Sequence, residues 1–268
     1  MNIQDLEPKV IWKNFHALTQ IPRPSKHEGK VIEYLYNWGV SHGFETIKDK
    51  TGNIIIRVPA TPGMENRQGV ILQGHMDMVP QKTSDSDHDF LKDPIKAYVD
   101  GEWVTADRTT LGADNGIGVA MGLAALEDPS VKHGPLEVLV TYDEETGMTG
   151  ANKLEPGVLK GDILLNLDSE EEGELCVGCA GGLDASAGFK YRKYNTPEGH
   201  KGLTLDIKGL QGGHSGMDIS LYRANANRAM ARILLPLVEL FGVKVVSFTG
   251  GSLRNAIPFE AHAEIAVP

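Results

Sequence analysis

The first 180 residues alternate between helix-like and strand-like segments, and this order constrains the fold more than any other feature. Apolar residues recur at helical spacing over 10–20 and 30–43, and strand-like runs follow at 53–60 and 69–79. Strong helix formers occupy 119–128, and further apolar strand-like runs occupy 135–145 and 161–168. This alternation predicts an α/β domain with a layered sheet.

The pattern changes after residues 179–183. Residues 184–194 and 200–210 alternate in the manner of strands, 225–241 form an amphipathic helical pattern, and another strand-like run begins at 243. We therefore predict two domains, 1–183 and 184–268. The second is expected to be a small α+β module that is incomplete where the chain stops at Pro268.

Side chains that can bind metal ions cluster where the strand-like runs end. In open α/β sheets the carboxyl ends of strands form ligand sites, which makes these positions candidates. The candidates are His75 and Asp77 in GHMDMVP, Asp114 in LGADNGIG, Glu144 and Glu145 in TYDEETG, and Asp168 in LNLDSEEEG.

Each candidate also has a simpler explanation. His75 and Asp77 can be a polar pair at a strand end, Asp114 a turn or helix cap, and Asp168 a solvated strand terminus. Adjacent carboxylates such as Glu144 and Glu145 repel each other unless a cation or solvent compensates. One imidazole among several carboxylates suits Zn, Mn or Co better than an ion that prefers thiolates.

Charge and cysteine content exclude other classes of protein. With 36 acidic and 26 basic residues the formal charge is −10, which argues against nucleic acid or an anionic membrane as a partner. Cys176 and Cys179 cannot build a disulfide framework, and we expect them to be small packed residues. No stretch is continuously apolar enough for a membrane span, so a cytoplasmic protein is expected.

Four motifs, in their order along the chain, carry a resemblance to a known family. GHMDMVP, GADNGIG, DEETGMTGA and LNLDSEEEGE resemble the motifs of the co-catalytic dinuclear metallopeptidases, the family that includes carnosinase. The residues of these motifs and their spacing along the chain are most similar to those of the bacterial dipeptidases of this family. The similarity extends through IPRPSKHEG and GGHSGMDI to the whole chain. The resemblance implies a zinc-peptidase-like catalytic domain, with a mixed sheet flanked by helices, and an inserted α+β lid and dimerisation domain.

The resemblance also implies a role for each site residue. His75 and Asp168 match ligands of one metal ion, Asp114 the bridging carboxylate and Glu145 a ligand of the second ion. Asp77 matches the residue that orients His75, and Glu144 the general base that takes a proton from the attacking water. The implied cofactors are two divalent ions, Zn foremost with Co or Mn as alternatives. The implied reaction is hydrolysis of dipeptides, including those that end in histidine.

The second domain resembles the family's lid, through which two subunits form a homodimer. His214 in GGHSG matches a histidine that steadies the substrate or its developing oxyanion, and Arg254 and Asn255 match residues that engage the carboxylate end of the substrate. Without the resemblance, an ordinary glycine-rich turn with an incidental histidine is the favoured interpretation of His214.

The chain departs from the family in its length. Family members continue after the lid, complete the catalytic sheet and supply a C-terminal histidine to the second metal ion. The sequence is therefore expected to be a fragment of a longer enzyme or a truncated, catalytically weak metal-binding remnant. The alternatives are an amidohydrolase of the same superfamily that acts on N-acyl amino acids and, more remotely, a redox protein that uses CVGC.

Overall fold

The fold consists of two compact units. The structure, a computed structural model, describes residues 2–169, 173–178 and 186–268. Contacts divide the chain into Met1–Ala180 and Gly181–Pro268. The domain boundary expected between residues 183 and 184 lies outside the described residues and stays a prediction. Among the helices of the described residues, none is long and apolar enough to cross a membrane.

The first unit contains most of the secondary structure. Its elements are η1 (Ile3–Asp5), α1 (Lys9–Thr19), α2 (Gly29–Ser41), β1 (Glu45–Lys48), β2 (Ile54–Val58), β3 (Val70–His75), β4 (Ala97–Asp100), β5 (Trp103–Ala106), α3 (Ala113–Glu127), β6 (Leu136–Thr141), α4 (Glu144–Gly147), α5 (Thr149–Asn152) and β7 (Ile163–Asn166). The strands predicted at 53–60, 69–79, 135–145 and 161–168 correspond to β2, β3, β6 and β7. The strand β1 and the short β4–β5 hairpin were not predicted from the sequence.

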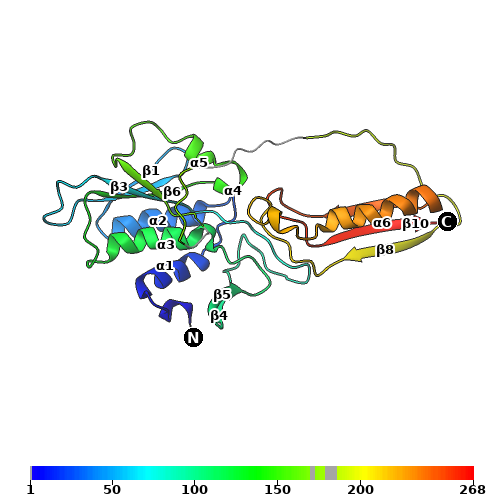
Figure 1. The fold of residues 1–268 in the computed structure, drawn as a ribbon, viewed down its shortest axis with the longest axis horizontal. Helices are drawn as coiled ribbons and strands as arrows, with labels where there is room; N and C mark the ends of the chain where they lie inside the picture. Colours follow the sequence, from blue (N-terminus) through cyan, green and yellow to red (C-terminus); the bar gives the residue numbers. More distant parts are fainter. Residues whose placement is uncertain (1, 170–172, 179–185) are drawn as a thin grey trace. The chain divides into compact units, whose positions relative to one another are not determined.

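Five strands of this unit form one mixed sheet in the order β1-β2-β6-β3-β7. β3 runs parallel to both β6 and β7, whereas β2 runs antiparallel to β1 and β6. Helices α2 and α3 pack on one face of the sheet, and α1 packs against α3 (Figure 1). The predicted α/β fold, with a mixed sheet and flanking helices, is confirmed.

Successive side chains of each strand point to opposite faces of the sheet, so the strands contribute to two separate hydrophobic clusters. In β2, Ile54 and Ile56 point into the large cluster that the helices cover, whereas Ile55 packs with Ile71 and Leu139 on the opposite face. This second cluster is smaller and is covered by apolar residues of the 154–159 segment. Both faces are thus buried over the middle strands, as expected where parallel pairing occurs.

Parallel pairing brings two strand ends to the same edge of the sheet. β3 and β6 are in register from Val70 opposite Leu136 to His75 opposite Thr141. β7 lies on the other side of β3 and also runs parallel to it. The segments that follow β6, β3 and β7 therefore leave the sheet at neighbouring positions, which is where the site is built.

The second unit is a separate α+β module. It contains β8 (Lys201–Ile207), η2 (Ile219–Leu221), α6 (Ala226–Phe241), β9 (Lys244–Gly250) and β10 (Ala261–Val267). The strands form an antiparallel sheet in the order β8-β10-β9. Ala226, Met230 and Leu234 recur every four residues along α6 and are buried against this sheet.

One predicted strand of this module is wrong over the residues that are described. Residues 186–194 contain no strand, and Phe189, Tyr191 and Tyr194 are 85%, 78% and 68% exposed. Alternation in a sequence marks the two faces of an extended segment, but a strand also needs a hydrogen-bonded neighbour. No neighbouring strand pairs with this segment among the described residues.

Candidate metal centre

Backbone contacts join the ends of the three parallel strands. Met76 N–H, directly after β3, donates to Thr141 O at 3.0 Å, and Leu167 N–H, directly after β7, donates to Gln73 O at 2.8 Å. His75 and Asp77 are thereby placed between the turn that carries Glu144 and the segment that carries Asp168. The predicted location of the site at the carboxyl ends of the strands agrees with this geometry.

His75 lies at the centre of the candidate residues. Its side chain is 1% exposed, and Nε2 lies 2.9 Å from Asp114 Oδ1, 3.7 Å from Asp168 Oδ1 and 3.9 Å from Glu144 Oε2. Nδ1 lies 3.3 Å from Asp77 Oδ1, at ion-pair distance. The structure therefore brings together residues that the sequence analysis took from four separate motifs.

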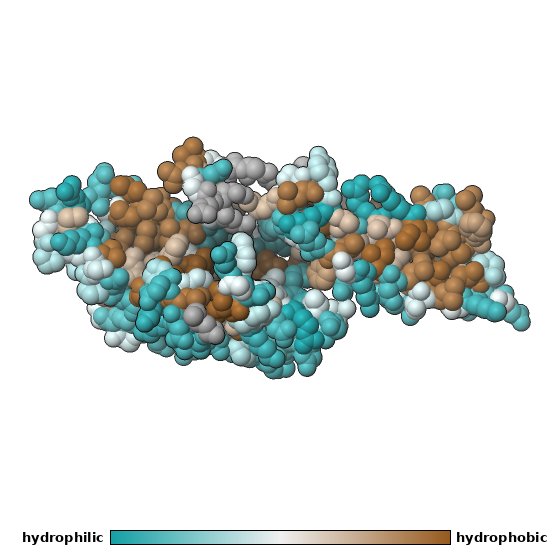
Figure 2. Space-filling model, turned by 60° about the horizontal axis from the view of Figure 1, so that its bottom comes forward, coloured by the Kyte–Doolittle hydropathy of each residue, from teal (hydrophilic) through white to brown (hydrophobic). Residues whose placement is uncertain are grey.

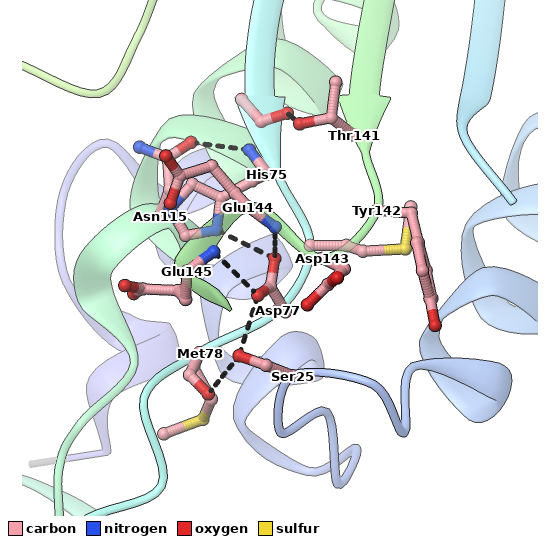
Figure 3. Close-up of polar contacts among 12 residues, drawn as sticks. Ser25, His75, Asp77, Met78, Asn115, Thr141, Tyr142, Asp143, Glu144 and Glu145 are labelled. Atoms are coloured by element: carbon pink, nitrogen blue, oxygen red, sulfur yellow. Dashed lines mark hydrogen bonds and ion pairs between the residues drawn. The ribbon is translucent and has the colours of Figure 1, made fainter. Parts of the chain in front are cut away.

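Asp77 connects His75 to the two glutamates that follow β6. Its carboxylate accepts the backbone N–H groups of Glu144 at 3.0 Å and of Glu145 at 3.2 Å, and the Ser25 hydroxyl at 2.8 Å (Figure 3). These hydrogen bonds and the contact with His75 lower the pKa of Asp77 although burial acts to raise it. One fully buried carboxylate thus positions both the histidine of β3 and the glutamates that follow β6.

Asp143 shapes the turn that presents the two glutamates. It is buried with φ 49°, and its carboxylate accepts the hydroxyls of Thr146 and Thr149. Its backbone N–H donates to Glu28 Oε1 at 3.2 Å. Burial raises the pKa of Glu28 to about 7. The conformation of the turn is therefore fixed by interactions behind the site.

Asn115 links the strand ends to α3, and the sequence analysis missed it. Its Oδ1 accepts the backbone N–H of His75 at 3.2 Å, and its Nδ2 donates to Leu167 O at 2.8 Å. The side chain is buried and lies beside His75 (Figure 3). Its neighbour Asp114 was recognised as a site residue, but an asparagine in GADNG reads equally well as a turn residue.

Arg23 is a second residue that sequence reasoning missed. It is 2% exposed, and its guanidinium donates to Met76 O and Asp77 O, both at 3.0 Å, and to Gly112 O. A Cβ on Gly112 would lie 2.6 Å from Nη2, so a glycine is needed at this close approach. Burial lowers the pKa of Arg23 to about 10, and nearby carboxylates act in the opposite direction.

The pKa values of the cluster reflect crowded acidic groups. Burial and the carboxylate of Asp114 raise the pKa of Glu145 to about 8, and burial with neighbouring carboxylates raises that of Asp168 to about 6. Burial acts to lower the pKa of His75, but Asp114 and Asp77 outweigh it and raise the value to about 11. In the metal-free protein the raised pKa values therefore favour the protonated forms of His75 and of the acidic side chains around it.

The donor set has the chemistry of a metal site. Ligand atoms of His75, Asp114 and Asp168 lie within 4.8 Å of one another, and so do those of His75, Glu144 and Glu145. The carboxylates of Asp114, Glu144 and Asp168 are 41%, 31% and 26% exposed, so one side of the cluster is open to solvent. An imidazole with several carboxylates fits a divalent transition metal.

The three candidate residues of the second unit also lie together. His214 forms a β-bridge with Ala256, and Ser215 N–H donates to Asn255 O at 2.9 Å. The GGHSG loop is therefore paired with the loop that carries Arg254 and Asn255. For the cysteines, the expected packed environment is wrong for Cys176, which is exposed, and Cys179 lies outside the described residues.

Comparisons with known proteins show the family of the chain. The sequence pattern of peptidase family M20/M25/M40 matches residues 71–246. The chain is 51% identical over 265 residues to the cytosol non-specific dipeptidase of Escherichia coli, covering 99% of the chain and 55% of that protein. It is also 51% identical to the crystal structure of aminoacylhistidine dipeptidase from Vibrio alginolyticus, with a TM-score of 0.67, covering 100% of the chain and 55% of that structure.

A more distant relative supports the fold alone. Aminopeptidase PepT from Bacillus cereus is 20% identical, with a TM-score of 0.54, over 98% of the chain and 67% of that structure. The chain spans about half the length of the dipeptidases that it matches.

Replacing Arg23 with Met is expected to lower the free energy of unfolding by about 3 kcal/mol or more, because three carbonyl groups lose a charged donor inside the core. Urea denaturation followed by circular dichroism measures this change. Arg67→Met, at an exposed arginine of the same unit, is the control. Equal stability of the two variants would contradict the role assigned to Arg23.

The metal-free protein is expected to become less stable as the pH rises from about 5 to 8. Glu145 titrates near 8 when folded against 4.5 when unfolded, and His75 near 11 against 6.5, so the folded chain holds the extra protons throughout this window. Asp77 has a lowered pKa and titrates below the window. Urea midpoints across this pH range, after treatment with a chelator, check the trend. Glu145→Gln should weaken it, and a stability that rises with pH would contradict it.

Proposed function

The chain belongs to peptidase family M20/M25/M40, and we propose that its protein hydrolyses dipeptides, including those that end in histidine, at a metal centre built on His75. The observation that carries the proposal is the convergence of one histidine and four acidic side chains around Asp77, at the ends of β3, β6 and β7 and at the start of α3. The identity to two proteins named as dipeptidases supports the choice of substrate.

In this proposal His75, Asp114 and Asp168 would hold one metal ion, and Asp114 and Glu145 would contribute to holding a second. Bound divalent ions lower the pKa of a coordinated water and polarise the scissile carbonyl. Zn fits one imidazole with several carboxylates, and Co and Mn are the alternatives. Asp77 acts from behind the site, where it orients His75 and holds the backbone of both glutamates.

Glu144 is assigned the proton transfer. Its side chain is 31% exposed and lies 3.9 Å from His75 Nε2, so it borders the solvent-open side of the cluster. From there its carboxylate can take a proton from the attacking water and deliver it to the leaving amine. Because Asp77 and Asp143 fix the turn, Glu144 and Glu145 can have different roles although they are adjacent.

The second unit is proposed to contribute substrate contacts and the dimer interface. His214 would donate a hydrogen bond to a substrate oxygen, and Arg254 and Asn255 would bind the carboxylate end of the dipeptide. Exposed apolar residues support an interface on this unit, where Leu235, Leu240 and Phe241 of α6 are 58%, 74% and 65% exposed. Brown apolar surface is visible over this unit in Figure 2. We place the protein in the cytoplasm, in line with the name of its E. coli relative.

Dipeptide hydrolysis is tested on the protein at its full encoded length, incubated with Zn, Co or Mn. Turnover of dipeptides such as β-alanyl-histidine and glycyl-histidine is compared with that of N-acetylated amino acids. Faster hydrolysis of dipeptides supports the proposal. Preference for N-acetyl amino acids would identify an amidohydrolase, and absence of turnover despite bound metal would identify a metal-binding protein without this activity.

Alanine at Asp114 or Asp168 is expected to reduce the bound zinc, because each carboxylate lies within reach of His75 Nε2. Metal content after dialysis, measured by mass spectrometry, reports the loss. Asp162→Ala removes an exposed acid just before β7 and serves as the matched control. Unchanged zinc stoichiometry in both site variants would contradict the ligand assignment.

Replacing Glu144 with Gln is expected to lower dipeptide turnover by roughly 10²-fold or more while metal content stays near that of the parent, because the amide cannot accept the proton. Glu145→Gln is the paired variant and should lose metal instead. If Glu144→Gln loses metal and Glu145→Gln keeps it, the two roles are exchanged.

A further inference from the structure

The loop that carries His214 also fixes the position of its ring. The backbone N–H groups of Gly216 and Met217 both donate to His214 Nδ1, each at 3.2 Å. A ring nitrogen that accepts hydrogen bonds carries no proton, so the ring proton is on Nε2. In this arrangement the imidazole can donate only through Nε2.

An ion pair inside the same segment holds this loop. Asp218 Oδ2 accepts the backbone N–H of His214 at 2.7 Å, and Asp218 Oδ1 lies 2.9 Å from Arg223 Nη2. Arg223 Nη1 donates to Gly212 O at 2.9 Å. The side chains of Arg223 and Asp218 are 21% and 24% exposed, so the pair is largely shielded from solvent. The guanidinium therefore contacts Gly212, before Gly213, directly, and it contacts His214, after Gly213, through Asp218.

Gly213 allows this close packing. Its φ is +140°, a conformation that side chains with a Cβ rarely adopt, and a Cβ there would lie 2.5 Å from Asp218 Oδ2 and would also meet Arg223 Nη1. The glycine, the aspartate and the arginine are thus parts of one arrangement. An ordinary glycine-rich turn does not require an ion pair such as that between Asp218 and Arg223 to hold its backbone.

The other side of the loop is fixed by the neighbouring segment. Ile257 N–H donates to Gly213 O at 2.8 Å, and Ser215 N–H donates to Asn255 O at 2.9 Å. His214 therefore has limited freedom in its backbone, and its ring is oriented by the two amides that bind Nδ1.

We propose that Arg223 is a positioning residue that acts through Asp218 to hold His214 as a donor from Nε2. This inference rests on the proposed function, in which His214 contacts a substrate oxygen. A hydrogen-bond donor fixed before the substrate binds suits an oxygen that gains negative charge during attack on a carbonyl, since no reorganisation is then needed. Arg223 itself does not touch the substrate.

The first test is spectroscopic and needs no enzymatic activity. The 268-residue chain, with ¹⁵N-labelled histidine, is examined by NMR at pH 8, and the His214 ring signals are assigned with His214→Gln. The parent should show an unprotonated Nδ1 and a protonated Nε2. Arg223→Met and Asp218→Asn should shift His214 toward a mixture of tautomers, and Arg223→Lys should restore part of the parent signal. Arg232→Met, at an exposed arginine of α6, should change nothing.

Folding of the variants is read from His262 in the same spectra, because its Nδ1 lies 2.8 Å from Asp206 across the sheet of the same unit. A variant that moves the His262 signals is counted as misfolded, and the comparison then rests on Asp218→Asn and Arg223→Lys. A mixture of tautomers in the parent, or parent-like His214 signals in folded Arg223→Met, would overturn the proposal.

A kinetic test separates this inference from the proposed function. In the protein at full encoded length, Arg223→Met should lower kcat for dipeptides by about 10- to 100-fold with little change in KM, because a misplaced donor affects chiefly the transition state. An unchanged kcat would overturn the positioning role. If the parent has no dipeptidase activity but shows the single His214 tautomer, the proposed function fails and the structural inference stands.

Discussion

The site depends on keeping acidic side chains together at one edge of a sheet. Asp77, Asp114 and Glu145 all lie near the buried guanidinium of Arg23, whose charge favours their ionised forms. The same guanidinium binds carbonyl groups of the segment after β3 and of the turn before α3. One cation therefore reduces the repulsion between these acidic side chains and also fixes the distance between the loops that carry them.

Sequence patterns were sufficient for features that depend on local spacing or on the order of elements. β6 was predicted as an apolar strand-like run, and burial on both faces of the sheet explains why its residues are mostly apolar, with Glu137 as the exception. His75 and Asp168 could be grouped before the structure was known, because parallel strands end at a common edge. Their grouping is confirmed by geometry, whereas their roles as ligands stay a proposal.

Other features depend on contacts that no sequence window contains. Asn115 joins residues 75 and 167, and Arg23 joins residues 76, 77 and 112, so neither function is visible in the residues next to it. The failed strand at 186–194 shows the same limit. Its residues do alternate in the pattern of a strand, but whether a neighbouring strand pairs with the segment depends on the three-dimensional fold.

The register between β3 and β6 also limits how this chain can change during evolution. Side chains in a strand alternate between faces, so inserting or deleting one residue before His75 within β3 would turn either the histidine or the buried apolar residues to the wrong face. Changes in length are then restricted to the connections on the opposite edge, such as residues 59–69, where most side chains are partly or fully exposed. The sheet therefore tolerates insertions and deletions mainly in the loops at the end opposite to His75 and the acidic side chains.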